Sequence, residues 1–483
     1  MISNNSIYSK EKNKFLKLIS KNLKRDSIIY GNKKINYEDL ISYIIQINNF
    51  LTKNKLENKT IIIQLKNRLH TFLFYLAAIF SKTTICPLDP KLPTSRVKNI
   101  KQIINAKKII KKINLNNKKN KDIKKLNLKN HNFLITFSSG TSGKPKGICH
   151  DANNILGISF SYSKLVKFNK KTQILHCLPE FYMAGIVNNF FSCLCGSSKI
   201  ILVNSFNKNS IFSIWSDIRK YKVNTIYLIP SIYSMVTNFS PNNAAVLVKK
   251  YKIKFLSTSN NLYPNIRKTF YKKFKTKILS CYGITEMGGP LTNELNGSLE
   301  TDSVGKLIDG CNFKIVRLNN KNILFFKSKF LCTSIIKDTK FEKLKLDKKG
   351  FFNSQDTGFL KNKNLIITGR EKDILKKGGE FINLKDIENI ILSWRMVRDV
   401  AAISIENELS DEKLHIFIVL KTKLIKREYL DELMKIIDTN MYKTEKPDKI
   451  VFLRKMPKTV SGKIVKRELK FINAKNKIRE IIL

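Results

Sequence analysis

The feature that most constrains the fold is the stretch FLITFSSGTSGKPKGICH, from Phe133 to His150, where a short apolar run leads into a polar turn. The run Phe133–Phe137 predicts a buried strand. The turn that follows, Ser138–Gly147, contains three glycines, four hydroxyl side chains and two lysines. Glycine lets backbone N–H groups approach an anion closely, hydroxyl groups donate hydrogen bonds to it, and lysine adds positive charge. The composition therefore predicts a cradle for a triphosphate, with a basic surface turn as the alternative interpretation.

The order of the residues in this turn adds a resemblance to a known family. The segment Ser138–Gly147 resembles, at every position, the phosphate loop of the adenylate-forming (AMP-binding) superfamily, which includes acyl-CoA synthetases, the adenylation domains of peptide synthetases, and luciferases. The resemblance implies that the turn binds ATP. The residues that it assigns to nucleotide binding here are Ser138, Ser139, Gly140, Thr141, Ser142, Gly143, Lys144 and Lys146.

The charge of the chain is strongly unbalanced. Its 483 residues include 90 Lys and Arg against 37 Asp and Glu, which gives a formal net charge of +53. Such an excess attracts nucleic acids, anionic membranes and acidic proteins. The basic residues are spread along the whole length among Asn and Ile, as codon bias in an AT-rich genome would produce, so charge alone predicts no specific nucleic-acid partner.

Cysteine usage and hydropathy bear on the compartment. The eight cysteines form no CxxC pair, so we expect reduced thiols rather than a zinc site or disulfides. The longest clean apolar run, Phe72–Phe80, is far shorter than the ~20 residues of a membrane span. The first residues lack the apolar core of a signal peptide. We therefore expect a cytoplasmic protein without a transmembrane segment.

Apolar runs alternate with amphipathic stretches in the first half of the chain. Asn36 with Asp39 predicts a capped helix start. The alternation predicts βαβ units and a mainly parallel sheet. The expected strands lie at 60–65, 83–86, 174–179, 199–203 and 225–230, and the expected helices at 40–51 and 70–80.

Two smaller units are expected after this region. Short strands at 322–326 and 330–336 predict a small β subdomain. A C-terminal part has strands at 398–405, 414–420 and 449–453 and a helix at 425–438. We predict an α/β fold in which a large N-terminal domain of βαβ-type sheets, flanked by helices and carrying the small β subdomain, precedes a small mobile C-terminal α+β domain.

A second motif, Tyr282-Gly283-Ile284-Thr285-Glu286, follows the apolar residues of ILSC. It matches the superfamily pattern in full. The resemblance implies that Tyr282 stacks near adenine, that Thr285 contacts the α-phosphate, and that Glu286 holds Mg²⁺ together with Thr141. The metal assignment agrees with chemistry, because Mg²⁺ prefers one or two carboxylates together with phosphate oxygens.

Three further positions resemble the family's nucleoside contacts. Asp356 lies in FFNSQDTGF, which is similar to the family's Thr-Gly-Asp segment, and a carboxylate can accept both ribose hydroxyl protons. Arg370 matches the arginine that contacts the ribose in the family. Asn260 falls where the family has a small Gly-Ala-Pro segment beside adenine, so we expect a more polar adenine wall.

The segment Leu178–Gly185 resembles the family element that helps to line the acyl site, with Tyr182 in place of the usual histidine. It lacks the aspartate by which amino-acid-adenylating members hold an ammonium group, so the resemblance implies a plain carboxylic acid as substrate. The expected neighbourhood of the acyl pocket comprises Tyr182, Met183, Ser257, Met287 and Gly288.

The C-terminal part resembles the movable lid of the family. Lys372 falls at the hinge, which divides the chain into domains of residues 1–371 and 372–483, and Gly378-Gly379 matches the hairpin that lines the thiol tunnel. Near the C-terminus, MPKTVSGKIVKREL matches the family's final motif, in which Lys463 is the catalytic lysine.

The resemblance implies an AMP-forming acid–thiol ligase similar to an acyl-CoA synthetase. ATP and Mg²⁺ would activate a small-molecule carboxylic acid as an acyl-adenylate, with Lys463, Thr141 and Glu286 as catalytic residues. The acyl group would pass to CoA or to the phosphopantetheine thiol of an acidic acyl carrier protein. Amino-acid adenylation, a catalytically inactive relative that only binds, and nucleic-acid binding based on charge are the alternatives.

Overall fold

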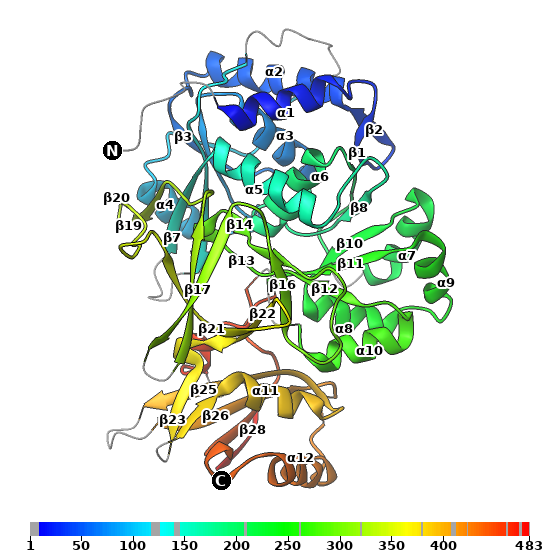
Figure 1. The fold of residues 1–483 in the computed structure, drawn as a ribbon, viewed down its shortest axis with the longest axis vertical. Helices are drawn as coiled ribbons and strands as arrows, with labels where there is room; N and C mark the ends of the chain where they lie inside the picture. Colours follow the sequence, from blue (N-terminus) through cyan, green and yellow to red (C-terminus); the bar gives the residue numbers. More distant parts are fainter. Residues whose placement is uncertain are drawn as a thin grey trace.

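The computed structural model describes residues 9–116, 126–139, 145–206, 210–259, 262–318, 321–377, 380–406, 412–422, 424–459, 462–472 and 476–482. Two seven-stranded sheets and a six-stranded sheet form a large N-terminal part, and a four-stranded sheet belongs to a smaller C-terminal part. Figure 1 shows the smaller part below the larger one. The predicted α/β fold with a small C-terminal α+β domain is confirmed.

The first seven-stranded sheet has the order β20-β19-β7-β6-β4-β3-β5. Its strands β3, β4, β5 and β6 run parallel, as the βαβ alternation predicts, whereas β6 and β7 form an antiparallel hairpin. The polar turn of the first motif therefore joins two paired strands. The bounds are β3 Thr60–Ile63, β4 Thr84–Pro87, β5 Lys108–Ile110, β6 Asn132–Ser139, β7 Pro145–Asp151, β19 Ser334–Lys337 and β20 Lys340–Glu342.

The first five helices of the chain include one with a predicted cap and one that is almost wholly buried. The predicted capping box of Asn36 and Asp39 is present at the start of α2. Every residue of α3 except His70 is buried, so the longest clean apolar run of the sequence is part of a core helix. The bounds are α1 Lys10–Ser20, α2 Tyr37–Lys53, α3 Arg68–Ile79, α4 Thr94–Ile103 and α5 Ala152–Leu165.

The second seven-stranded sheet has the order β12-β11-β10-β8-β9-β1-β2 and is parallel except at the hairpin of β1 and β2. Its strands are β1 Asp26–Tyr30, β2 Lys33–Asn36, β8 Gln173–His176, β9 Lys199–Leu202, β10 Thr225–Leu228, β11 Lys254–Ser257 and β12 Ile278–Ser280. Its neighbouring helical segments are η2 Ala184–Phe191, α6 Ser192–Cys195, α7 Ser210–Tyr221, α8 Pro230–Phe239, α9 Ala244–Tyr251 and α10 Pro264–Phe274.

The six-stranded sheet, of order β15-β16-β22-β21-β18-β17, is the predicted small β subdomain. The prediction was wrong about its second strand: β19 begins only at Ser334 and pairs with β7 of the first sheet instead. The chain therefore leaves the small β subdomain at β19 and adds this strand to the first seven-stranded sheet. Its strands are β15 Thr292–Asn293, β16 Ser303–Leu307, β17 Cys311–Leu318, β18 Lys321–Ser328, β21 Phe352–Lys361 and β22 Asn364–Arg370. A separate two-stranded sheet of β13 Gly283–Ile284 and β14 Gly289–Pro290, with η3 Thr285–Met287 between them, precedes it in the chain.

The C-terminal part begins with the hairpin of β23 and β24 and continues into the sheet β25-β26-β27-β28. Asn383 caps α11 by accepting a hydrogen bond from the backbone of Lys385. The sequence did not predict β28. The bounds are η4 Glu371–Asp373, β23 Ile374–Lys377, β24 Glu380–Asn383, α11 Leu384–Ser393, β25 Val397–Glu406, β26 Glu412–Leu420, α12 Arg427–Asn440, η5 Lys443–Glu445, β27 Lys449–Leu453, α13 Lys466–Leu469 and β28 Lys477–Ile482.

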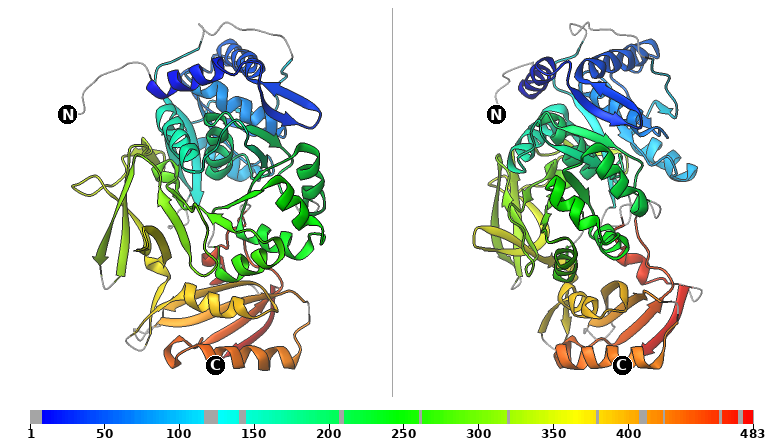
Figure 2. Two further views of the ribbon diagram at one scale, coloured as in Figure 1. Left: turned by 45° about the vertical axis from the view of Figure 1, so that its right-hand side comes forward. Right: turned by 90° about the vertical axis from the view of Figure 1, so that its right-hand side faces the viewer.

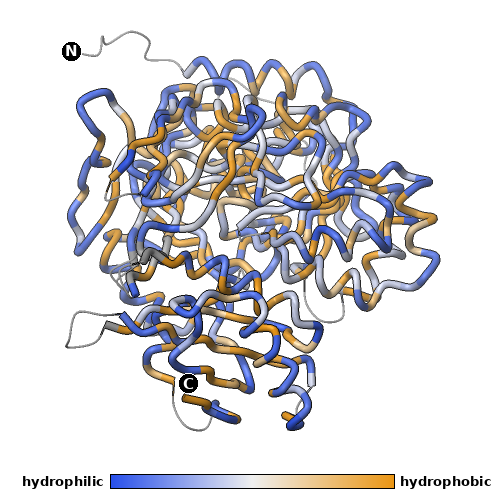
Figure 3. The backbone as a smooth tube through the Cα atoms, turned by 60° about the horizontal axis from the view of Figure 1, so that its bottom comes forward, coloured by the Kyte–Doolittle hydropathy of each residue, from blue (hydrophilic) through white to orange (hydrophobic). Residues whose placement is uncertain are grey.

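Hydrophobic residues concentrate in the interior of both parts, while hydrophilic residues follow the outer loops and helices (Figure 3). Separate apolar clusters lie in the N-terminal sheets and in the C-terminal part, whose core includes Trp394 and Leu433. Among the described residues, none of the helices combines the length and apolar character needed to cross a bilayer.

Helix α1 is attached to the N-terminal part by a buried lysine. The ammonium of Lys12 donates to the carbonyl oxygens of Asn127 and Lys129 and to Nδ1 of His131. Nε2 of His131 can then donate to the carbonyl of Ala78, 3.0 Å away. Burial lowers the pKa of Lys12 to about 7, against a smaller opposite effect of Asp151.

This burial should make stability depend on pH. Between pH 7 and about 10.4, the ordinary lysine pKa, the unfolded chain binds a proton at Lys12 that the folded chain has released. Stability therefore rises with pH across this window, by at most about 1.4 kcal/mol per pH unit. We expect urea unfolding of the wild type to gain stability relative to Lys12→Met from pH 7 to pH 9. Parallel curves for the two proteins would contradict the assignment.

Candidate active site

The first and second motifs meet at Lys146, which lies on the hairpin of β6 and β7. Ser138 lies opposite Lys146 in the strand register. The ammonium of Lys146 lies 2.9 Å from Oε1 of Glu286, in the second motif. Both side chains are mostly buried but retain some exposure. The predicted phosphate-binding lysine and metal-binding carboxylate therefore share one site.

A second contact pair lies on the six-stranded sheet. Asp356 on β21 lies opposite Arg370 on β22, and Nε of Arg370 is 3.0 Å from Oδ1 of Asp356. The hydroxyl of Tyr282 donates to Oδ2 of the same carboxylate. Three residues that the sequence assigned to the nucleoside thus form one hydrogen-bonded group.

The backbone around Tyr282 is tightly packed. A Cβ atom on Gly283 would lie 2.4 Å from the carbonyl oxygen of Gly289, so only glycine fits between β13 and β14. Burial raises the pKa of Tyr282 well above its ordinary value, which keeps its hydroxyl protonated as a donor. Burial also raises the pKa of Asp356, whereas Arg370, Tyr282 and Lys463 act in the opposite direction.

Lys463 lies in the C-terminal part, near the end of the chain. It lies on a tight turn in which the backbone N–H of Lys463 donates to Oγ1 of Thr459, and Thr459 donates to the carbonyl of Lys463. The turn contacts the N-terminal part, because a Cβ on Gly462 would lie 2.7 Å from Cδ1 of Ile229. The right-hand view of Figure 2 shows the red C-terminal chain rising toward the green helices of the N-terminal part. The turn thus lies against the N-terminal part, and the charge of Lys463 acts to lower the pKa of Asp356.

Comparison with known protein families shows where the chain belongs. The AMP-binding enzyme model matches residues 18–324, which is more than half of the chain. The chain belongs to the AMP-binding enzyme family. A second model, the AMP-binding enzyme C-terminal domain, matches residues 386–463.

Two curated relatives of this AMP-binding protein are CoA ligases. A malonate–CoA ligase of Arabidopsis thaliana is 24% identical over 373 residues, covering 70% of this chain and 60% of that protein. An oxalate–CoA ligase of Saccharomyces cerevisiae is 23% identical over 346 residues, covering 69% of this chain and 62% of that protein. The chain thus spans about three fifths of the length of these relatives.

Solved structures share the fold of this family member. ATP-bound MatB from Rhodopseudomonas palustris superimposes with a TM-score of 0.81 at 17% identity, covering 95% of this chain and 98% of that chain. The apo structure of MatB gives a TM-score of 0.71 at 18% identity over the same shares. At these identities the likeness concerns the fold.

In this AMP-binding protein, a buried ion pair anchors the segment Leu178–Gly185. Nε of Arg68, at the start of α3, lies 2.9 Å from Oε2 of Glu180, and both side chains are buried. The guanidinium also donates to the carbonyl of Leu178, and Tyr75 donates to the carbonyl of Glu180. The sequence does not predict this anchor, since no local pattern links residues so far apart.

The residues expected around the acyl pocket differ in exposure. Tyr182 and Met183 are partly exposed. Ser257 is wholly buried, and its carbonyl accepts a hydrogen bond from the backbone of Cys281, next to Tyr282. Met287 is wholly buried and packs in the core of the six-stranded sheet. A Cβ on Gly288 would lie 2.6 Å from the carbonyl of Phe330, so backbone already fills this side.

A buried polar network lies behind Tyr282. Nδ2 of Asn188, on η2, is 3.0 Å from the hydroxyl of Tyr227 and 3.6 Å from Sγ of Cys281. Tyr162 links Tyr227 to Oδ1 of Asn293, with both contacts at 2.8 Å. These contacts join η2, β10 and α5 and fix the strand that leads into the second motif. None of these residues was predicted from the sequence to belong to the site.

Several expected site residues lie outside the described residues or have side chains that do. The first group comprises Gly140, Thr141, Ser142, Gly143, Lys144, Asn260, Gly378 and Gly379. The side chains of the second group belong to Ser138, Ser139 and Lys372. For Thr285, the carbonyl accepts a hydrogen bond from the backbone of Gly288 in the short helix η3.

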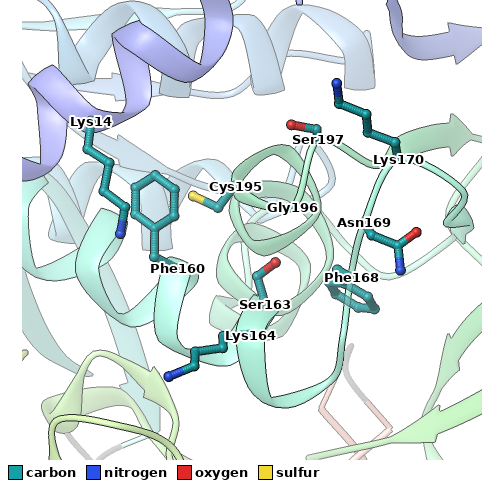
Figure 4. Close-up of a pocket in the computed structure, with 10 residues that line it drawn as sticks. All are labelled: Lys14, Phe160, Ser163, Lys164, Phe168, Asn169, Lys170, Cys195, Gly196 and Ser197. Atoms are coloured by element: carbon teal, nitrogen blue, oxygen red, sulfur yellow. The ribbon is translucent and has the colours of Figure 1, made fainter. Parts of the chain in front are cut away.

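A surface hollow of about 430 Å³ lies away from the motifs, between α1, α5 and the turn after α6 (Figure 4). Lys14, Phe160 and Cys195 contribute to its lining, and the ammonium of Lys14 is 3.8 Å from the centre of the Phe160 ring. None of the residues assigned to the site lines it. We therefore place no substrate in this hollow.

Proposed function

We propose that the chain is an AMP-forming acid–thiol ligase, which joins a carboxylic acid to a thiol through an acyl-adenylate. A carboxylate is a poor electrophile, so its direct reaction with a thiol requires a better leaving group. The observation that carries the proposal is the hydrogen-bonded group of Asp356, Tyr282 and Arg370, with the turn of Lys463, from the C-terminal part, packed against the N-terminal part. Such an arrangement can hold a nucleotide and add positive charge at its reacting phosphate.

In the first step, the carboxylate oxygen of the acid attacks the α-phosphate of ATP, and pyrophosphate leaves. Asp356 accepts hydrogen bonds from the ribose hydroxyl groups. Arg370 favours the ionised form of the Asp356 carboxylate, which these bonds require. Tyr282 supplies an aromatic face beside adenine. Lys463 bridges the substrate carboxylate and the α-phosphate, so it stabilises negative charge that develops in the transition state.

The phosphate turn acts on the leaving group. Thr141, Ser142, Lys144 and Lys146 donate to the β- and γ-phosphates, and Thr285 contacts the α-phosphate. Among the described residues, no cluster of three or more His, Cys, Asp or Glu side chains could hold a metal ion. The single carboxylate of Glu286 nevertheless fits Mg²⁺, since this ion takes most of its remaining ligands from phosphate and water. Bound there with Thr141, Mg²⁺ would neutralise phosphate charge.

For the second step, we propose that the part after Lys372 moves as a lid that withdraws Lys463 and admits a thiol beside Gly378 and Gly379. The closer agreement with ATP-bound than with apo MatB supports the view that the described arrangement belongs to the first step. The boundary at Lys372 agrees with the gap between the two family matches.

CoA is the favoured acceptor because the curated relatives are CoA ligases. An acidic carrier protein is the second candidate acceptor, since the net charge of +53 would attract it. For the acid, we propose a carboxylic acid without an amino group, because Leu178–Gly185 contains no aspartate and the carboxylate of Glu180 is paired with Arg68. Amino-acid adenylation is therefore not favoured.

Acid-dependent pyrophosphate exchange tests the proposal. The purified protein should be supplied with ATP, Mg²⁺ and short, medium-chain, dicarboxylic, aromatic, sugar-derived and amino acids, and then with CoA or phosphopantetheinylated carrier protein. We expect exchange with at least one non-amino acid, and thioester formation with one acceptor. Exchange with amino acids alone would support amino-acid adenylation, and no exchange with any acid would support a relative that only binds.

Gly462 offers a test of how closely the Lys463 turn must approach. Its φ of +79° lies in the left-handed region, and an added Cβ would meet Ile229. We expect Gly462→Ala to lower the pyrophosphate exchange rate by about 10- to 100-fold, because small displacements of catalytic groups are costly. Gly31→Ala is the matched control, since Gly31 has a φ of +59° in open space. Equal rates for the two variants would contradict the proposed contact.

A further inference from the structure

A buried carboxylate in the C-terminal part, that of Glu388, binds three donor groups. Oε1 of Glu388, on α11, lies 2.9 Å from the backbone nitrogen of Ala402 and 2.9 Å from the ammonium of Lys466. Its Oε2 accepts a hydrogen bond of 2.9 Å from the hydroxyl of Tyr263. Because Glu388 is only 5% exposed, these partners stabilise a charge that burial alone would disfavour.

Lys466 connects Glu388 to the turn that carries Lys463. It begins α13, directly after the bridge between Lys458 and Ile464 that closes the turn. Its ammonium also lies 3.7 Å from Asp373, beside the proposed hinge. Partial burial acts to lower the pKa of Lys466, but Glu388 and Asp373 outweigh it and raise that pKa. Lys466 therefore stays charged and holds the base of the turn in place.

Tyr263 belongs to the N-terminal part, so its bond to Glu388 crosses between the domains. It immediately precedes α10. Two further contacts cross nearby: Nδ2 of Asn265 donates to the carbonyl of Leu392, and the ammonium of Lys385 lies 2.8 Å from Asp302. A rotation of the C-terminal part as a body would separate Tyr263 from Glu388 while leaving the pair of Glu388 and Lys466 intact.

We propose that Glu388 is a positioning residue for Lys463 and that the hydroxyl of Tyr263 is a latch for the adenylate-forming arrangement. Glu388 fixes Lys466 and thereby the turn of Lys463. Tyr263 joins this unit to the N-terminal part only when Lys463 faces Asp356. The proposal rests on the proposed ligase function. A single hydrogen bond suits a latch, because a bond from a hydroxyl to a charged carboxylate typically corresponds to a roughly 12- to 160-fold change in an equilibrium, which a rotating domain can overcome.

The half-reactions separate this role from a purely structural one. We expect Tyr263→Phe to lower acid-dependent pyrophosphate exchange by roughly 12- to 160-fold, with thioester formation from supplied acyl-adenylate equal to or faster than that of the wild type. Tyr221→Phe is the matched control, since its hydroxyl bonds to Gly31 within the N-terminal part. Loss of both half-reactions to the same extent, or no difference between the two variants, would overturn the latch.

Glu388→Gln tests the positioning role and keeps acceptor and donor groups for Ala402 and Tyr263. Removing the charge paired with Lys466 should lower exchange by about 10-fold or more, again without loss of thioester formation from the adenylate. Asp438→Asn is the control, because Asp438 pairs with Lys446 on the surface of the same domain. Urea unfolding midpoints of both variants establish whether they fold. A folded Glu388→Gln protein with wild-type exchange would overturn the proposal.

A measurement without catalysis distinguishes failure of the latch from failure of the ligase function. Spin labels at the exposed positions Phe239 and Tyr442 report the distance between the two parts. We expect one dominant distance in the wild type and in Tyr221→Phe, and an added population in Tyr263→Phe. Identical distance distributions in all three proteins would refute the latch, whereas a shifted distribution without exchange by any acid would refute only the ligase function.

Discussion

Replacing Lys463 with alanine is expected to lower acid-dependent pyrophosphate exchange by about 10²- to 10³-fold, the usual cost of losing one preorganised charge donor. The effect should be confined to the first half-reaction. In the proposed second arrangement, Lys463 has left the site, so thioester formation from a supplied acyl-adenylate should proceed at nearly the wild-type rate. Separate assays of exchange and of thioester formation measure the two steps.

The physical reason lies in the position of the lysine relative to the nucleoside group. The charge of Lys463 acts on Asp356, which is itself bonded to Arg370 and Tyr282. A lysine at this place adds positive charge near the α-phosphate, where negative charge develops in the proposed transition state. Another exposed lysine of the same segment does not. Lys470→Ala is therefore the control. If Lys463→Ala abolished both steps in a folded protein, or neither, the assigned role of Lys463 would be wrong.

The elements and the motif order were predictable because they depend on local patterns. The apolar run at Phe133–Phe137 produced β6, and Asn36 with Asp39 capped α2. The resemblance also named Asp356, Arg370 and Tyr282. Nothing in their spacing predicts that Arg370 and Tyr282 both bind the carboxylate of Asp356. Asp356 and Arg370 come together through the register of β21 and β22, which the pattern of one strand leaves open until its partner strand is known.

Polar contacts between residues far apart in the chain could not be predicted from the sequence for a different reason. Arg68 and Glu180, or Tyr263 and Glu388, look like ordinary surface residues until tertiary packing buries them. Charged residues of this kind are rarely buried without a partner, so burial itself identifies the pair. Only Lys466 could have been singled out, because it is part of the C-terminal motif that contains Lys463. The assignment of β19 failed similarly, since its partner β7 is remote in sequence.

The largest effect on stability is expected at Arg267, on α10. Arg267 is 1% exposed and lies 2.8 Å from Oε2 of Glu294, which is 3% exposed. The guanidinium also donates to the carbonyls of Leu262, Ile278 and Ser303. Removing one partner of a buried ion pair leaves an unpaired charge, which costs about 3–5 kcal/mol. We expect Arg267→Met to lose about this much free energy of unfolding, measured by urea denaturation at pH 8.

The pH dependence identifies the unpaired carboxylate as the cause. Burial raises the pKa of Glu294, and Arg267 opposes this effect in the wild type. Without Arg267 the pKa rises further, so the folded variant binds a proton that the unfolded chain has released, and its stability falls as pH increases through that window. Arg267→Met should therefore be less destabilising at pH 5 than at pH 8. The double variant Arg267→Met with Glu294→Gln should recover part of the loss at pH 8, because no charge stays buried. An equal loss at both pH values, with no recovery in the double variant, would mean that packing around the guanidinium outweighs its charge.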